Sequence, residues 1–139
     1  MSALAILASL MGGAPQAPAQ GLSRLIEVVD ANTVDRHVNI LVQFRCGVRY
    51  VTHSPNDLGS SMAVRMRLGP DCNAGSSVPS ERPSISGNSD LLRSAQLEEL
   101  APGEVTVTLG WGQTLNYVLA PTTDGRGFRV RLLDAVPLL

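Results

Sequence analysis

The sequence predicts an all-β protein, an antiparallel β-sandwich made of two pseudo-symmetric units of one chain. Three observations support this fold class: apolar and polar residues alternate over long stretches, turn-forming residues separate these stretches, and the pattern occurs twice. Alternation gives a strand one buried face and one wet face. Because each unit is too small to bury a core alone, packing the two apolar faces together hides both from water. A closed barrel of the same strands is an alternative, and an immunoglobulin-like fold is less favoured because its Cys-Trp-Cys spacing is missing.

An internal repeat defines the two units. Without a gap, Val38, Ile40, Val42, Phe44, Val48, Tyr50 and Val51 match Val105, Val107, Leu109, Trp111, Leu115, Tyr117 and Val118. Once one residue is dropped from the turn, Met62, Val64 and Arg65 match Phe128, Val130 and Arg131. We therefore expect a single domain over 20–139, with one copy at about 22–68, the other at about 91–133, and a joining loop over 69–90.

The first copy predicts three stretches of strand. An apolar segment over 22–29 comes first, then a long alternating run from Val38 to Tyr50, and then a return strand that carries Met62, Val64, Met66 and Leu68. The long run exceeds the usual strand length, so Gly47 is expected to divide it by a bulge or bend. The turn-rich stretch 53–61 closes the hairpin.

The second copy predicts the same elements. The segment 91–100 supplies a strand, although Asp90 could cap a short helix there instead. A long run with its apolar face at Val105, Val107, Leu109, Trp111, Leu115 and Tyr117 follows, and Gly110 and Gly112 mark its bend. After a turn over 121–127, the return strand carries Phe128, Val130 and Leu132.

The N-terminal residues 1–19 are predicted to be a signal peptide. They hold no charge, an apolar run from Ala3 to Met11, and an Ala-Pro-Ala triplet at 17–19 that suits signal peptidase. The run is too short to span a bilayer. An uncleaved tail is the alternative, and the pattern departs from the usual one because no basic residue precedes the run. The apolar end, 136–139, is typical of a chain that continues into another domain.

Two cysteines agree with export. Cys46 lies on the outgoing strand of the first hairpin and Cys72 just past its return strand, so the fold would bring them together as a disulfide. Such a cross-link stabilises a domain by about 3 kcal/mol in the chain-entropy model. The alternative is a pair of free thiols, one buried and one exposed. With only His37 and His53 beside them, they do not form a plausible zinc set.

Arginine supplies every basic residue, and its placement predicts a binding surface. Arg45, Arg49, Arg65 and Arg67 are expected on the outward face of the first hairpin, and Arg129 and Arg131 on that of the second. Guanidinium groups gathered in this way bind carboxylate or phosphate groups bidentately. The alternative is that they only keep an exposed sheet face soluble and discourage edge pairing. The net charge of -1 gives no basic excess, so nucleic acid is not an expected partner.

The remaining sequence offers no candidate for catalysis or for a cofactor. The stretch 69–90 is rich in Ser, Pro and Gly and has no period, so it is a linker between the sheets or else a binding loop. It contains no Gly-x-Ser-x-Gly elbow, phosphate loop or paired-carboxylate pattern. We therefore do not expect an enzyme.

Two short copies of apolar alternation, each ending in a strand rich in Val, Arg and Leu, in an exported chain, make this sequence similar to the AMIN domain of bacterial cell-wall amidases. The likeness covers about Leu22 to Leu133. It implies a symmetric sandwich of two sheets, and attachment to peptidoglycan or localisation at an envelope machine. The chain departs from that family in its predicted disulfide and its long central loop, and the arginine surface is inferred from the residues alone.

Together these features predict a non-catalytic, periplasmic or secreted targeting module without a membrane span in its mature part. Its expected partner is peptidoglycan or an envelope protein, and the outward arginines would bind carboxylates. The alternative is a protein-interaction domain of a secretion or pilus assembly that adds a partner strand at a sheet edge.

Overall fold

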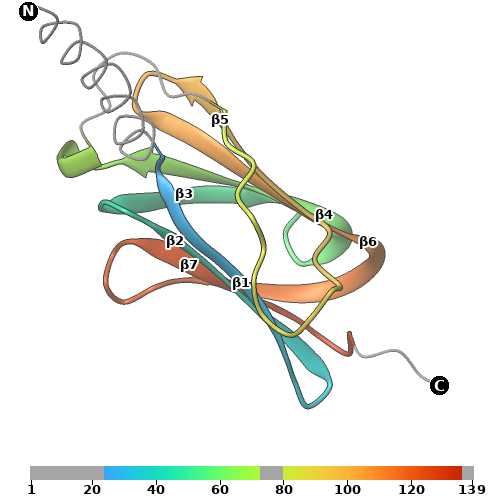
Figure 1. Ribbon diagram of the computed structural model, residues 1–139. Helices are drawn as coiled ribbons and strands as arrows, with labels where there is room; N and C mark the ends of the chain where they lie inside the picture. The colour runs from blue at the N-terminus through green and yellow to red at the C-terminus, as the bar shows by residue number, and fades with distance from the viewer. Residues whose placement is uncertain (1–23, 73–79, 136–139) are drawn as a thin grey trace, which may run out of the picture.

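The computed structural model describes residues 24–72 and 80–135, which form an antiparallel all-β fold (Figure 1). Its strands are β1 (Ile26–Val34), β2 (His37–Phe44), β3 (Val48–Ser54), β4 (Leu58–Leu68), β5 (Ser94–Ala101), β6 (Glu104–Pro121) and β7 (Gly127–Leu132). A short 3-10 turn, Pro70–Cys72, follows β4. The predicted all-β, antiparallel class is confirmed. The predicted signal peptide and the apolar chain end lie outside the described residues.

The strands pair in the order β1-β2-β7-β6-β4-β3, and β5 pairs with β6 as well. The long strand β6 takes part in two groups, as its curved course in Figure 1 shows. Residues 117–121 of β6 pair with β7, which pairs with β2 and so leads to β1; we call these strands the first group. Residues 104–116 of β6 pair with β4 and β5, and β4 pairs with β3; these strands are the second group.

The bend of β6 lies where the glycines predict it. Gly112 has φ 82°, a left-handed conformation that residues with a side chain rarely adopt. The register between β4 and β6 breaks at the same place, because Ser61 faces Gly110 whereas Gly59 faces Leu115. The bend therefore lets one strand serve both groups, and Leu115, which follows it, is only partly buried.

The first copy is divided where Gly47 predicts a break. β2 ends at Phe44 and β3 begins at Val48, so the predicted long run is two strands. The turn that closes this hairpin is shorter than predicted, since β3 reaches Ser54 and β4 already starts at Leu58. The alternative of a helix over 91–100 is wrong, because β5 occupies that segment and pairs with β6.

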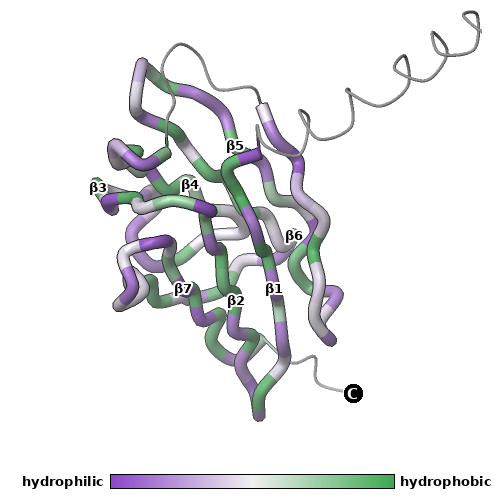
Figure 2. Tube along the Cα trace, turned by 60° about the vertical axis from the view of Figure 1, so that its left-hand side comes forward, coloured by the Kyte–Doolittle hydropathy of each residue, from purple (hydrophilic) through white to green (hydrophobic). Residues whose placement is uncertain are grey.

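One apolar core takes residues from both groups. The predicted inward residues Ile40, Val42, Phe44, Val107 and Trp111 are at most 1% exposed, and the described residues bury no charged side chain. Their outward neighbours on β2 are polar or partly exposed, so apolar and polar residues alternate along the strands (Figure 2). The alternation read from the sequence thus sets which face of each strand is buried.

The two groups also share a pairing register. In the first group Val38, Ile40 and Val42 of β2 face Leu132, Val130 and Phe128 of β7. In the second group Val105, Val107 and Leu109 of β6 face Met66, Val64 and Met62 of β4. The sequence repeat matches these β2 residues to these β6 residues, and these β7 residues to these β4 residues, in the same order.

The described end of the central loop, residues 80–93, lies along β1 and β5, and we call it the edge strap. Ala31 N donates to Ser86 O at 2.8 Å, and Ser86 N donates to Val29 O at 2.9 Å. On the other side Leu97 N donates to Glu81 O at 2.8 Å, and Glu81 N to Leu97 O at 3.0 Å. These residues therefore do more than span from one strand group to the other, because they satisfy backbone groups at both edges.

Candidate functional site

The predicted disulfide between Cys46 and Cys72 is confirmed, with the Cα atoms 5.0 Å apart. Asp71 supports the same junction, since Gly47 N donates to both of its carboxylate oxygens at 3.1 Å. The cross-link ties the connection between β2 and β3 to the 3-10 turn after β4. It therefore fixes the break in the first copy.

Three of the predicted arginines come together on the outward face of the second group. Arg49 of β3 faces Arg67 of β4 directly, and Arg65 lies two residues before Arg67 on the same face. Arg67 Nη2 forms an ion pair with Glu104 Oε2 at 2.9 Å. A carboxylate of the protein thus already neutralises part of this cluster.

Arg45 lies apart from this face. It follows β2 in the connection around Gly47, and its Nη1 donates to Arg24 O at 3.3 Å. Arg126 Nη1 in turn donates to Arg45 O at 2.9 Å. The sequence pattern placed Arg45 beside Arg49 because it treated the two strands as one.

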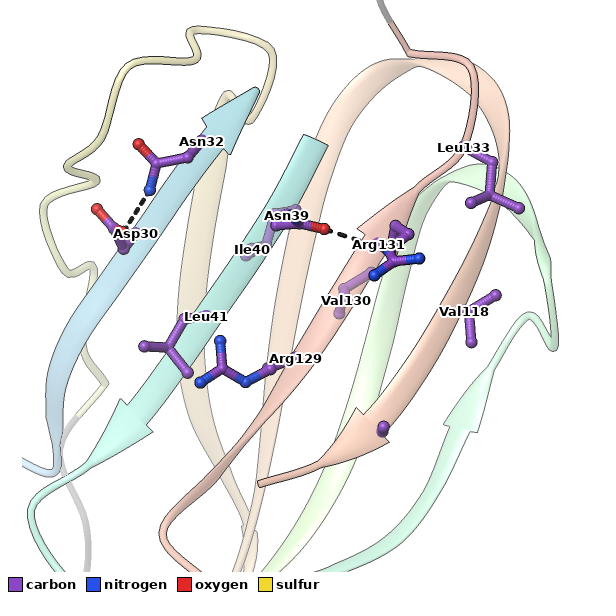
Figure 3. A pocket seen from close by; sticks show the side chains of 11 residues that line it. Asp30, Asn32, Asn39, Ile40, Leu41, Val118, Arg129, Val130, Arg131 and Leu133 are labelled. Atoms are coloured by element: carbon purple, nitrogen blue, oxygen red, sulfur yellow. Dashed lines mark hydrogen bonds between the residues drawn. The ribbon is translucent and has the colours of Figure 1, made fainter. Parts of the chain in front are cut away.

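Arg129 and Arg131 lie in a hollow of about 510 Å³ on the outward face of the first group (Figure 3). Strands β1, β2, β6 and β7 all contribute to it. Its polar wall comes from β1 and β2, the two arginines from β7, and apolar side chains from β2, from β6 and from the residue that follows β7. These lining residues are Asp30, Asn32, Asn39, Ile40, Leu41, Val118, Ala120, Arg129, Val130, Arg131 and Leu133.

Two rows of cross-strand neighbours form the floor of this hollow. One row runs Asp30, Leu41, Arg129, Ala120, and the other runs Asn32, Asn39, Arg131, Val118. Each arginine thus has an apolar residue as its neighbour on β6, and Leu41 is the neighbour of Arg129 on β2. Neither arginine has an acidic residue directly opposite it on β2 or β6.

Hydrogen bonds inside the hollow hold its one carboxylate in place and leave several guanidinium nitrogens of its two arginines without a partner among the described residues. Asp30 accepts from Asn32 Nδ2 at 2.6 Å and from Ser86 Oγ at 2.9 Å, one bond on each carboxylate oxygen. Arg131 Nε donates to Asn39 Oδ1 at 3.3 Å. Within the described ranges, the guanidinium of Arg129 has no hydrogen bond or ion pair with the protein. The hollow is therefore suited to an anion.

The sequence pointed to the two arginines but not to the hollow. Asn39 alternates with the buried residues Val38 and Ile40, which places it outward, and Asp30 and Asn32 alternate with Val29 and Ala31 in the same way. What the alternation does not show is that β2 lies beside β7, far along the chain. That pairing brings the polar wall to the arginines.

A second polar cluster lies at the turn between β3 and β4. Tyr50 Oη and His53 Nδ1 are 2.6 Å apart, and His53 Nε2 lies 2.8 Å from Asn56 O. Because a carbonyl only accepts, His53 Nε2 donates to Asn56 O, and in the neutral imidazole Nδ1 then accepts from the tyrosine hydroxyl. Tyr117 Oη donates to Pro55 O, and burial, helped by the charge of Asp57, raises the pKa of Tyr117.

The hydrogen bonds of this second cluster stabilise the turn between β3 and β4, and we call the cluster the brace. Its hydrogen bonds hold the 55–57 turn against β6, and Trp111 Nε1 adds a bond to Gly59 O at 2.8 Å. The rings of Trp111 and Tyr117 meet edge to face at 5.5 Å. The described residues also contain no group of three or more His, Cys, Asp or Glu side chains able to hold a metal ion.

Comparison with known proteins adds no assignment. The sequence matches no protein-family model, and no curated protein sequence matches it. No helix in the described ranges has the length and apolar character needed to cross a bilayer.

Proposed function

We propose that this protein is a non-catalytic binding module of the bacterial cell envelope, which attaches to peptidoglycan or to an envelope machine. The hollow around Arg129 and Arg131 is the observation that carries this proposal, since it offers two guanidinium groups that form no ion pair with a carboxylate of the described residues. The Cys46–Cys72 disulfide supports export to the periplasm or beyond, because such bonds persist in oxidising compartments. The similarity to the AMIN domain favours the same location.

We also infer that the fold is a sandwich of two sheets that arose by internal duplication. Support comes from the shared register, in which Ile40 faces Val130 in the first group as Val107 faces Val64 in the second. Ala31 beside Ile40 and Leu97 beside Val107 extend the correspondence to β1 and β5. All these side chains are at most 1% exposed and belong to one core, as two facing sheets require.

A binding role suits the chemistry of the hollow better than a catalytic one. Guanidinium groups stay protonated at any physiological pH, so they hold anions and do not transfer protons. The single carboxylate there, that of Asp30, already accepts two hydrogen bonds. Carboxylates of peptidoglycan stem peptides, or of an acidic envelope protein, are the ligands that paired arginines bind in bidentate fashion.

Retention on isolated peptidoglycan sacculi tests this proposal. We expect the wild type to sediment with sacculi and Arg129→Gln/Arg131→Gln to be retained at least tenfold less, with wild-type retention falling as salt is raised. Arg49→Gln/Arg65→Gln is the matched control, because it removes two outward arginines from the other group. Equal retention of all three proteins would dismiss the hollow as the site.

The alternative, partner-strand addition, is best placed at β3. The strap occupies the edges of β1 and β5. The open edge of β6 offers few free donors, because Tyr117 N already donates to Asp57 O and Pro121 has no N–H. Within the described ranges, β3 pairs with a strand on one side only. Pull-down of a protein partner that Tyr50→Pro abolishes, without retention on sacculi, would support this alternative.

A further inference from the structure

We propose that the hollow of the first group binds the terminal carboxylate of a short aliphatic peptide. This inference rests on the proposed binding function and specifies its ligand. Each part of such a ligand has a counterpart in the hollow: an anion site, an apolar wall and a free amide donor.

The anion site consists of Arg129 and Arg131, which lie two residues apart on β7 and so project from the same face. The bond from Arg131 Nε to Asn39 Oδ1 holds that guanidinium in place and leaves its two terminal nitrogens as donors. Since Arg129 has no partner among the described residues, both groups can donate to one carboxylate.

The apolar wall explains why an aliphatic neighbour would accompany the carboxylate. Leu41 and Ala120 flank Arg129, while Val118, which is 57% exposed, flanks Arg131. Leu133 completes this side of the hollow. A methyl or larger alkyl group packed here would lose contact with water, and the partial desolvation would strengthen the arginine-carboxylate attraction.

The amide of Asn39 favours a peptide over a simple anion. Its Oδ1 accepts from Arg131, which directs Nδ2 away from that arginine, and no described residue accepts from Nδ2. A peptide carbonyl next to the terminal residue is the acceptor that this donor fits. By contrast, the amide of Asn32 is occupied, since it donates to Asp30 and accepts from Asn88 N at 3.0 Å.

Titration of isotope-labelled protein with N-acetyl-alanyl-alanine, followed by amide chemical shifts, tests the proposal. We expect saturable shifts at Asn39, Leu41, Val118 and Arg129, with millimolar affinity as befits so small a probe. The same peptide with its terminus amidated should bind at least tenfold more weakly, because it has no charge for the arginines. Inorganic phosphate, which offers neither an alkyl group nor a carbonyl, should also bind more weakly.

Variants separate this site from a general charge effect. Arg129→Gln/Arg131→Gln should lose binding at least tenfold and Asn39→Ala a few-fold, while the control Arg49→Gln/Arg65→Gln should bind as the wild type does. Equal affinity for the amidated peptide, tighter binding of phosphate, or no effect of the β7 variants would overturn the proposal. If the peptide binds but sacculi do not retain the protein, the proposed envelope function fails and the peptide site stands. If sacculi retain the protein but the peptide does not bind, the peptide site fails and the envelope function stands.

Discussion

The outward faces of the two strand groups have the same backbone register but different side chains. In the first group the rows are Asp30, Leu41, Arg129, Ala120 and Asn32, Asn39, Arg131, Val118. In the second group the corresponding rows are Gln96, Thr108, Ala63, Ser54 and Glu98, Thr106, Arg65, Thr52. Arg131 and Arg65 occupy corresponding positions, and no other position of these rows has an arginine in both groups. The buried faces are alike because both serve one core, so the outward positions are where the two groups differ in what they can bind.

The distribution of charge increases this difference between the two outward faces. The row of Arg65 includes Glu98, and the adjacent Arg67 forms an ion pair with Glu104. In the two rows of the first group the one carboxylate, that of Asp30, accepts hydrogen bonds from Asn32 and Ser86. The arginines of the second face thus have carboxylates beside them, whereas Arg129 and Arg131 on the first face form no ion pair among the described residues, as the proposed anion site requires.

Substitution of a glycine is expected to give the largest difference in stability between the two groups. Gly127 faces Gln43 in the first group, whereas in the second the glycine stands on the opposite strand, as Gly110 facing Ser61. A Cβ on Gly127 would lie 1.9 Å from Val42 O, but one on Gly110 would lie 2.7 Å from Ser94 Oγ. Backbone cannot rotate away, whereas a serine hydroxyl can.

We therefore expect Gly127→Ala to lower the free energy of unfolding by about 3 kcal/mol or more, and Gly110→Ala by about 1 kcal/mol. Urea denaturation followed by tryptophan fluorescence measures both, since Trp111 is buried in the core. Similar losses in the two variants would contradict the expectation that an added Cβ is tolerated less well between β7 and β2 than at Gly110.

The disulfide gives the next largest effect, because it anchors the first copy through Cys46 to the turn after β4, and the second copy has no such cross-link. In the first copy the break between β2 and β3 is cross-linked through Cys46, while in the second copy β6 continues through its bend. Cys46→Ala/Cys72→Ala should lower the free energy of unfolding by about 3 kcal/mol or somewhat less. Hydrogen exchange should rise more at Gly47 and at position 72 than at Gly112. A uniform rise across both copies would contradict this local role.

The fold could be predicted from the sequence further than the site could. Alternation identified the buried faces of β2 and β6, and Gly47 and Gly112 marked the break and the bend, because burial and backbone conformation leave local signals. Pairing between distant strands leaves no such signal. Thus Arg45 was grouped with Arg49, from which a break separates it, and the wall that Asn39 forms beside Arg131 was missed.

A substitution in the edge strap should lower stability by less, and it compares the attachment of the strap to β1 with its attachment to β5. Gly87 has φ 105°, and a Cβ there would lie 2.1 Å from Ala31 O, so Gly87→Ala should detach the strap from β1. We expect a loss of about 1 to 2 kcal/mol in the free energy of unfolding. Exchange of the Ala31 amide should accelerate, while that of Leu97, which is bonded to Glu81, should change less.

Glu81→Gln is the companion variant. Its carboxylate accepts from Leu25 N at 2.6 Å and from Ile26 N at 3.1 Å, which secures the start of β1. Loss of one charge-assisted bond should cost about 1 kcal/mol and affect Ile26 more than Ala31. Equal exchange rates at both edges in the two variants would mean that the strap opens as one unit.

The smallest effect concerns pH and the brace at the β3–β4 turn. Burial and the charge of Asp57 raise the pKa of Tyr117 in the folded state. As pH rises through the unfolded value near 10, the unfolded chain therefore loses this proton first, which favours unfolding. The contribution of Tyr117 is thus fully present below about pH 9 and declines above about pH 10. The melting temperature of the wild type should fall more steeply above pH 10 than that of Tyr117→Phe, which has no phenol to ionise. Parallel curves for the two proteins would show that the Tyr117 hydroxyl ionises as readily in the brace as in the unfolded chain.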